Sequence, residues 1–160
     1  VDQEVERPHV RVGPEARAAI PALIETLRSG APDVVPDAVR ALGSIGPGAR
    51  SAVTAVINIL GTGAEEAAIN ASWSLGEIGK EAKAAKAAVP ALVKALATGS
   101  PGVRWMAAQA LGKMGSAARP AAPALTTAIA GGTVTLRSAA AQALARIEGS
   151  LNAADLHGLC

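Results

Sequence analysis

The sequence has no Phe or Tyr and only two Trp, so its apolar half is built almost entirely from aliphatic side chains. Ala, Leu, Val and Ile supply most of them, and Ala has the highest helix propensity of all residues. This composition excludes a core built on large aromatic rings. It favours helices that pack closely through small side chains.

The only cysteine, Cys160, is the last residue of the sequence. A single cysteine excludes an intramolecular disulfide and a paired-cysteine metal site. No apolar run approaches the roughly 20 residues that span a bilayer, and no basic segment followed by an apolar one opens the chain. We therefore expect neither a membrane span nor secretion, and a cytoplasmic location. The first residue is Val, which suggests a fragment or a processed product.

A short sequence phrase occurs four times along the chain. Ala-Leu-Gly-Ser-Ile-Gly at 41–46 recurs at 74–79 and 110–115, and more weakly at 143–148, with steps of 33, 36 and 33 residues. A second phrase, Pro-Ala-Leu or its variant Thr-Ala-Val, keeps the same spacing at positions 21, 54, 90 and 123. Two phrases with one period identify a structural repeat, in which similar layers stack without a single closed core.

Each period predicts two helices. The first has apolar residues at i, i+3, i+4 and i+7, which is one face of a helix, as in 20, 23, 24 and 27. Proline at positions 21, 90 and 123 predicts a bend in this helix rather than a break, and the glycine after it predicts a left-handed cap. The second helix contains the Leu-Gly phrase. Three extra residues within 80–88 predict a longer turn or an extra helical turn in the third period.

The same residues carry a family resemblance. The pattern Gly-x-x-Ala-x-x-Ala-(Val/Ile)-Pro-Ala-Leu, then Val-Arg-x-x-Ala-Ala-x-Ala-Leu-Gly-x-(Ile/Met)-Gly, resembles HEAT-like repeats, specifically the short variety of phycobilisome lyases. Residues 79–115 match it most closely, with Val103-Arg104 and Ala110-Leu111-Gly112. The resemblance implies a solenoid that binds other macromolecules, with the second helix of each repeat on the concave side. It carries no shared catalytic residues.

We therefore predict an all-α protein, a right-handed α-solenoid of about four two-helix repeats. The repeats are expected at residues 13–45, 46–78, 79–114 and 115–148, within one domain at 13–149. Residues 1–12 contain Pro8 and fit neither helix, so they are expected to form a linker or a partial N-terminal cap. Residues 150–160 are expected to form a tail or a short capping helix.

The open face of the second helices contains the only two Trp of the chain. In the third repeat, a projection at 100° per residue places Trp105, Gln109 and Gly112 on this face. An exposed Trp pair there is typical of a binding hot spot. Alternatively, each ring lies flat on a neighbouring helix and fills space left by Ala. The candidate partner-binding residues of this concave ridge are Trp73, Trp105, Ile69, Met106, Gln109 and Arg40.

Charge is distributed unevenly along the chain. Residues 13–78 have seven acidic and four basic side chains, whereas residues 79–147 have one acidic and nine basic. The basic half is a candidate surface for an acidic peptide or nucleic acid. The opposing interpretation is that the Arg after the second-helix Val pairs within the stack. The candidate anion-binding residues are Arg104, Arg137, Lys113 and Arg146.

Catalysis has little support in the sequence. His9 and His157 stand in opposite tails, Cys160 is terminal, and no Ser, His and Asp grouping recurs with the repeat. We expect a non-catalytic protein–protein interaction scaffold, without cofactor or metal, whose partner is another protein or peptide. Two alternatives stay open: nucleic-acid or other anionic-partner binding by the basic half, and a bilin lyase or chaperone-type role, which only the repeat subtype implies.

Overall fold

The computed structural model describes residues 14–62 and 64–158, with backbone alone at 14, 82 and 150–158, and every regular element within them is a helix. The expected linker at 1–12, with His9, and Cys160 lie outside these residues, as does the side chain of His157. The first helices of the repeats, here the A helices, are α2 (Ile20–Ser29), α4 (Val53–Thr62), α6 (Ala82–Thr98) and α8 (Ala122–Gly131). The second helices, here the B helices, are α3 (Val35–Ile45), α5 (Glu65–Ile78), α7 (Pro101–Met114) and α9 (Val134–Gly158).

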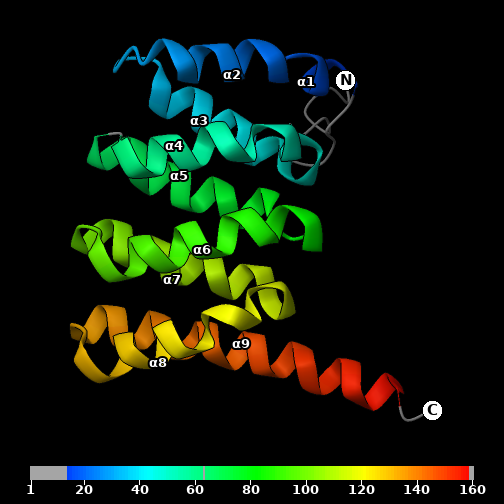
Figure 1. Cartoon of the computed structure of the whole chain (residues 1–160), viewed down its shortest axis with the longest axis vertical. Coiled ribbons are helices and arrows are strands. Elements are labelled where there is room, and N and C mark those ends of the chain that lie inside the picture. Colours follow the sequence, from blue (N-terminus) through cyan, green and yellow to red (C-terminus); the bar gives the residue numbers. More distant parts are fainter. Residues whose placement is uncertain (1–13, 63, 159–160) are drawn as a thin grey trace, which may run out of the picture.

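The helices pack in the order in which they occur along the chain. Each A helix contacts the B helix that follows it, and each B helix contacts the B helix of the next repeat. Figure 1 shows the resulting stack, with α2 at one end of the long axis and α8 and α9 at the other. This sequential packing of helix pairs is that of an α-solenoid, as the repeat predicts.

The leucine of the repeated phrase forms the centre of the core. Leu42, Leu75 and Leu111 have no exposed surface, and each lies on the inner side of its B helix. Burial of a leucine side chain contributes about 1.5–3 kcal/mol relative to exposure. The same position in the first three repeats therefore stabilises the contact between the A and B layers, whereas Leu144 of the fourth repeat is only half-buried.

The glycine after each leucine lies where two B helices meet. A Cβ atom on Gly76 would lie 2.8 Å from the Cβ of Ala110, and one on Gly112 would lie 3.0 Å from the Cα of Ala143. Only glycine allows two helix backbones to approach this closely. Gly112 is therefore buried between α7 and α9, and its predicted place on the open face of the helix is wrong.

The prediction that proline bends the A helices without breaking them is wrong for the first and fourth repeats. Pro21 and Pro123 stand in the first turns of α2 and α8, after the separate short helices α1 (Pro14–Ala18) and η3 (Gly115–Ala121). The second repeat is divided in the same way, between η2 (Gly46–Ala52) and α4, although it has Thr54 in place of the proline. Pro90 lies inside the continuous helix α6, as predicted.

The three extra residues of the third repeat explain why its A helix is continuous. Residues 79–81 form the connection after α5, and the next 17 residues form α6. In the second and fourth repeats, the 3-10 helices η2 and η3 begin directly after the B helix. The residues of η2 and η3 therefore form both the turn after the B helix and the start of the A-helix segment. The tightly wound 3-10 form is common in such short connections.

Left-handed glycines also occur at other places than predicted. Gly30, after α2, has the expected φ of 68°, but Gly99 and Gly132 have φ of −74° and −88° and are extended. Positive φ occurs instead at the ends of B helices, at Gly46 (73°) and Gly115 (58°). A residue with a Cβ atom is strained there, so these two glycines are needed for the turn into the next repeat.

Candidate interaction surface

The open side of the B helices carries the partner-binding candidates. We call this side the B surface and define it by the exposed or half-buried residues Arg40, Ile69, Trp73, Trp105, Met106 and Gln109. They come from three successive B helices, α3, α5 and α7, which lie side by side. All six predicted residues therefore lie on adjacent B helices and are at least partly accessible to solvent.

The two tryptophans of the B surface have different environments. Trp105 is 37% exposed on α7. Trp73 is half-buried on α5, and its Cζ3 atom would lie 2.5 Å from a Cβ atom on Gly43 of α3. The ring of Trp73 therefore lies against the neighbouring helix and fills space, whereas Trp105 presents its indole to solvent.

The side chains around Trp105 are held by contacts between α5 and α7. The Cδ1 atom of Ile69 would lie 2.9 Å from a Cβ atom on Gly102, so glycine at this position makes room for Ile69. Glu65 lies one turn before Ile69 on α5, and its Oε1 atom accepts a hydrogen bond from Ser100 at 2.9 Å. Ser100 also caps the N-terminus of α7. These contacts fix the position of α7, and with it the position of Trp105.

Polar side chains of α5 bind the backbone of α3. The Nδ2 atom of Asn70 donates to the carbonyl oxygen of Pro36 at 3.3 Å, and the buried Oγ of Ser74 donates to the carbonyl oxygen of Val39 at 2.7 Å. A buried hydroxyl without a partner would be unfavourable. The bond from Ser74 therefore explains how serine replaces alanine in this tightly packed layer.

A charged cluster lies beside Trp73. Glu77 of α5 forms an ion pair with Lys113 of α7, and it also accepts a hydrogen bond from Lys80 at 3.3 Å. Burial raises the pKa of Glu77, but the hydrogen bonds and charges of Lys113 and Lys80 together outweigh it, so that the pKa lies below its ordinary value. The ionised carboxylate of Glu77 is therefore the form that joins α5 to α7.

The four candidate anion-binding residues have different surroundings. The Nε atom of Arg104 donates to the carbonyl oxygen of Leu96 at 2.8 Å, and Lys113 pairs with Glu77. Arg137 and Arg146 are exposed on α9 and form no ion pair within 4.0 Å in the part of the chain whose side chains are described. Two of the four cations thus already bind groups inside the stack.

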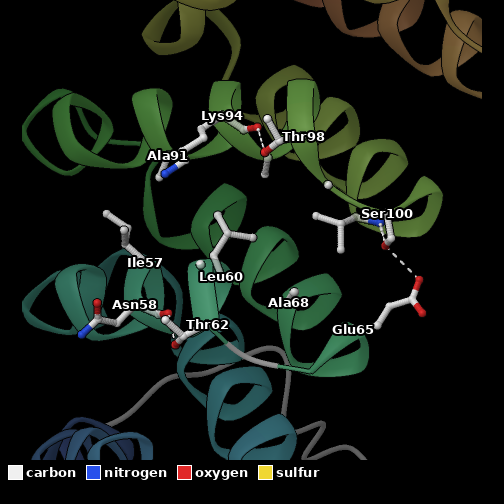
Figure 2. A pocket seen from close by; sticks show the side chains of 14 residues that line it. Ile57, Asn58, Leu60, Thr62, Glu65, Ala68, Ala91, Lys94, Thr98 and Ser100 are labelled. Carbon is white, nitrogen blue, oxygen red and sulfur yellow. Dashed lines mark hydrogen bonds between the residues drawn. The ribbon is translucent and has the colours of Figure 1, made fainter.

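A groove between α4 and α6 is a feature that the sequence analysis did not identify (Figure 2). Its volume is about 600 Å³, and residues of α4, α5, α6 and α7 line it. The corresponding space one repeat later, between α6 and α8, has a volume of about 420 Å³. Positions 68 and 104 are equivalent in successive repeats. The sequence signal for the groove is the difference between them, because Ala68 lines the first space and Arg104 lines the second.

Comparison with known protein families identifies the architecture. Residues 53–145, more than half of the chain, match the family model of HEAT repeats. The chain is a HEAT-repeat protein. Proteins of this family are typically interaction scaffolds and are usually non-catalytic. The match does not distinguish the short variety from other HEAT repeats, and no curated protein matches the chain.

The described part of this HEAT-repeat protein contains neither a metal-binding group nor a membrane span. No three His, Cys, Asp or Glu side chains come together among the residues whose side chains the structure describes. Over residues 14–62 and 64–158, none of the helices combines the length and the apolar character that crossing a bilayer requires.

Proposed function

We propose that this HEAT-repeat protein is a non-catalytic scaffold that binds another protein or peptide through the B surface, with Trp105 as the main anchor. The exposure of Trp105 carries this proposal, since 37% of a large apolar residue faces solvent in the middle of the layer of B helices. Trp is one of the residue types most enriched among energetically dominant interface residues.

The surroundings of Trp105 support an interface of this kind. Ile69 and Met106 are half-buried neighbours that add apolar area, and Gln109 supplies a polar group one turn further along α7. Trp has only two side-chain torsions, and the contacts of Ile69 and Ser100 hold α7 in place. Binding through Trp105 therefore requires little ordering of the surface, which favours affinity.

Binding of nucleic acid or another anionic partner by the basic half is the alternative. Arg104 and Lys113 already bind a carbonyl group and a carboxylate within the stack. Of the four candidates, Arg137 and Arg146 on α9 are left as exposed cations, so only half of the predicted anion-binding set is free to contact phosphate groups. The occupied cations favour a protein partner. A bilin lyase or chaperone-type role is implied by the family resemblance alone.

The experiment compares partners captured by the immobilised wild-type chain with those captured by Trp105→Ala. We expect Trp105→Ala to weaken binding by about 30-fold or more, as truncation of a dominant interface residue does. Val134→Ala is the matched control, because Val134 is also a large exposed apolar residue but lies at the start of α9.

Salt and a second variant separate the two proposals. For a protein partner anchored by Trp105, binding changes little with salt and survives Arg137→Ala/Arg146→Ala. Retention of the partner by Trp105→Ala, together with its loss in the double Arg variant and a steep decrease with salt, would show instead that an anionic partner binds the basic half.

A further inference from the structure

The groove lies between the A helices α4 and α6 and extends to the starts of the B helices α5 and α7. Its apolar lining comes from all four surrounding helices and includes Ile57, Leu60, Ala68, Ala91 and Val103. Figure 2 shows Ile57 and Leu60 on one side of this space and Ala91 on the other. Ligand-binding clefts typically have volumes of about 300–1,000 Å³, and the groove is of this size.

One lining residue differs strongly in size between this groove and the corresponding space of the next repeat. Ala68 lines it, whereas the corresponding residue of the next repeat is Arg104, which lines the smaller space between α6 and α8. The Nε atom of Arg104 donates to the carbonyl oxygen of Leu96, which is one of the last four carbonyls of α6. The methyl group of Ala68 cannot occupy the same volume or make the same bond, so the groove between α4 and α6 stays open.

The polar groups of the rim have a definite charge pattern. The hydroxyl groups of Thr62 and Thr98 are not directed to a ligand, because they donate to carbonyl groups of their own helices, those of Asn58 and Lys94. Lys94 is exposed and forms no ion pair within 4.0 Å in the side chains that the structure describes. The carboxylate of Glu65, held by Ser100, lies toward the other end of the groove (Figure 2).

We propose that this groove binds an extended peptide segment of another protein, with an apolar side chain in the groove, an acidic side chain at Lys94 and a basic side chain at Glu65. Charge complementarity at the two ends and the apolar lining between them define this occupant. Alternate side chains of an extended segment point to the same side. The segment therefore has the pattern acidic-x-apolar-x-basic, and its binding does not depend on the B surface.

The probe is a set of fluorescent peptide pools, whose binding to the full chain is measured by anisotropy. The pools carry Glu-x-Leu-x-Lys, Glu-x-Leu-x-Glu, Lys-x-Leu-x-Lys and Glu-x-Gly-x-Lys, where x is a mixture of uncharged residues. We expect the wild type to prefer the first pool. Each mismatched charge should weaken binding by about twofold to fivefold, as for exposed ion pairs. Replacement of Leu by Gly should weaken it by about tenfold or more.

Charge variants of the protein should change this preference in a defined way. Glu65→Lys gives the groove two basic ends, so this variant should prefer the Glu-x-Leu-x-Glu pool. Lys94→Glu gives it two acidic ends, so this one should prefer Lys-x-Leu-x-Lys. These expectations hold for either direction of the peptide in the groove. Lys83→Glu is the matched control, because Lys83 is exposed on the same helix as Lys94 but does not line the groove.

A filling variant tests the groove itself. Ala68→Arg places at position 68 the residue that the next repeat has at position 104, and we expect it to fold and to bind all pools more weakly, because the arginine takes up part of the groove. Trp105→Ala should bind the pools as the wild type does, which distinguishes this site from the B surface. Circular dichroism shows whether Ala68→Arg is folded, and the charge variants decide the question if it is not.

Several results would overturn the proposal. Binding of the four pools with equal affinity by the wild type would exclude the charge pattern, as would an unchanged preference in both Glu65→Lys and Lys94→Glu. Full binding by folded Ala68→Arg would exclude the groove. Absence of binding to Glu-x-Leu-x-Lys at concentrations up to about 1 mM would exclude a peptide site of useful affinity.

Discussion

The Nζ atom of Lys113 lies 5.7 Å from the centroid of the Trp73 ring, and the same ammonium group pairs with Glu77. Lys113 belongs to α7, whereas Trp73 and Glu77 belong to α5. One side chain thus joins two repeats by a cation–π contact and an ion pair. Lys80 binds the same carboxylate, but it lies only three residues from Glu77, in the connection directly after α5, and joins no second helix.

Replacement of Lys113 should therefore affect stability more than replacement of Lys80. We expect Lys113→Met to lower the free energy of unfolding by about 1 kcal/mol, since both interactions are partly exposed and each is worth about 0.2–1 kcal/mol. Lys80→Met is the matched control, with an expected loss below about 0.5 kcal/mol. Urea unfolding followed by circular dichroism measures both values. Equal losses would show that the contact across the repeats adds nothing.

Substitution of Gly76 should separate two B helices. A Cβ atom there would lie 2.8 Å from the Cβ and 2.9 Å from the Cα of Ala110, and the backbone of α7 cannot give way as a flexible side chain does. We expect Gly76→Ala to lower the free energy of unfolding by about 1–3 kcal/mol.

Gly61 provides the control for this substitution. It lies in α4, has no positive φ, and a Cβ atom on it would meet nothing within 4 Å. Gly61→Ala should leave the free energy of unfolding unchanged or raise it by up to about 1 kcal/mol, because alanine favours the helix. Similar losses in Gly76→Ala and Gly61→Ala would argue against close approach as the reason for glycine at position 76.

Glu77 should make the stability depend on pH in the acid range. Because its pKa is lower in the folded chain than the ordinary value of 4.5, folding favours the ionised carboxylate. The contribution of Glu77 to stability is therefore complete above pH 4.5 and is lost as the pH falls through the lowered value. We expect Glu77→Gln to be less stable than the wild type at neutral pH and to lose less stability on acidification.

The measurement is the free energy of unfolding in urea at a series of pH values on both sides of 4.5. Lys113→Met should reduce the acid dependence in part, because it removes the hydrogen bond and the charge that lower the pKa of Glu77 most. Identical acid profiles of the wild type and Glu77→Gln would contradict the role of this carboxylate.

Arg104 and Arg137 occupy corresponding positions of successive repeats. Among the described side chains, the guanidinium of Arg104 donates a hydrogen bond to the carbonyl oxygen of Leu96, and that of Arg137 donates none. We expect Arg104→Met to lower the free energy of unfolding by about 1 kcal/mol, because a carbonyl group at the end of α6 loses its partner. Arg137 is exposed, and Arg137→Met should change the value by less than about 0.5 kcal/mol. A reversed order in thermal or urea unfolding would contradict this assignment.

Periodicity made the fold predictable from the sequence. Leu42, Leu75 and Leu111 recur with the period of the repeat, and all three are fully buried in B helices. The same alignment placed Trp73 and Trp105 on the open side of these helices. The breaks in the A helices were not predictable from the proline at positions 21, 90 and 123, because the second repeat has the break with Thr54 at the corresponding position. There the short connection imposes the tighter 3-10 form.

The candidate sites depended more on contacts between repeats. The regular turn of a helix fixes the direction of each side chain around its axis. The pattern of a single repeat therefore predicts that Trp105 lies on the open face of its helix. Whether a ring stays exposed depends on the residues of the adjacent B helices, and Gly43 of α3 gives the ring of Trp73 a surface to lie on. In the same way, a projection of one helix could not show that Gly112 is covered by α9.

The sequence by itself determined the α-solenoid and the buried leucine positions of its core, because both follow from the period of the repeat. The tertiary structure alone decided that Trp105 is the more exposed indole, that Lys113 is bound to Glu77, and that the groove lined by Ala68 is larger than the corresponding space lined by Arg104. These features arise between repeats, where side chains some 33–36 residues apart in the sequence come into contact.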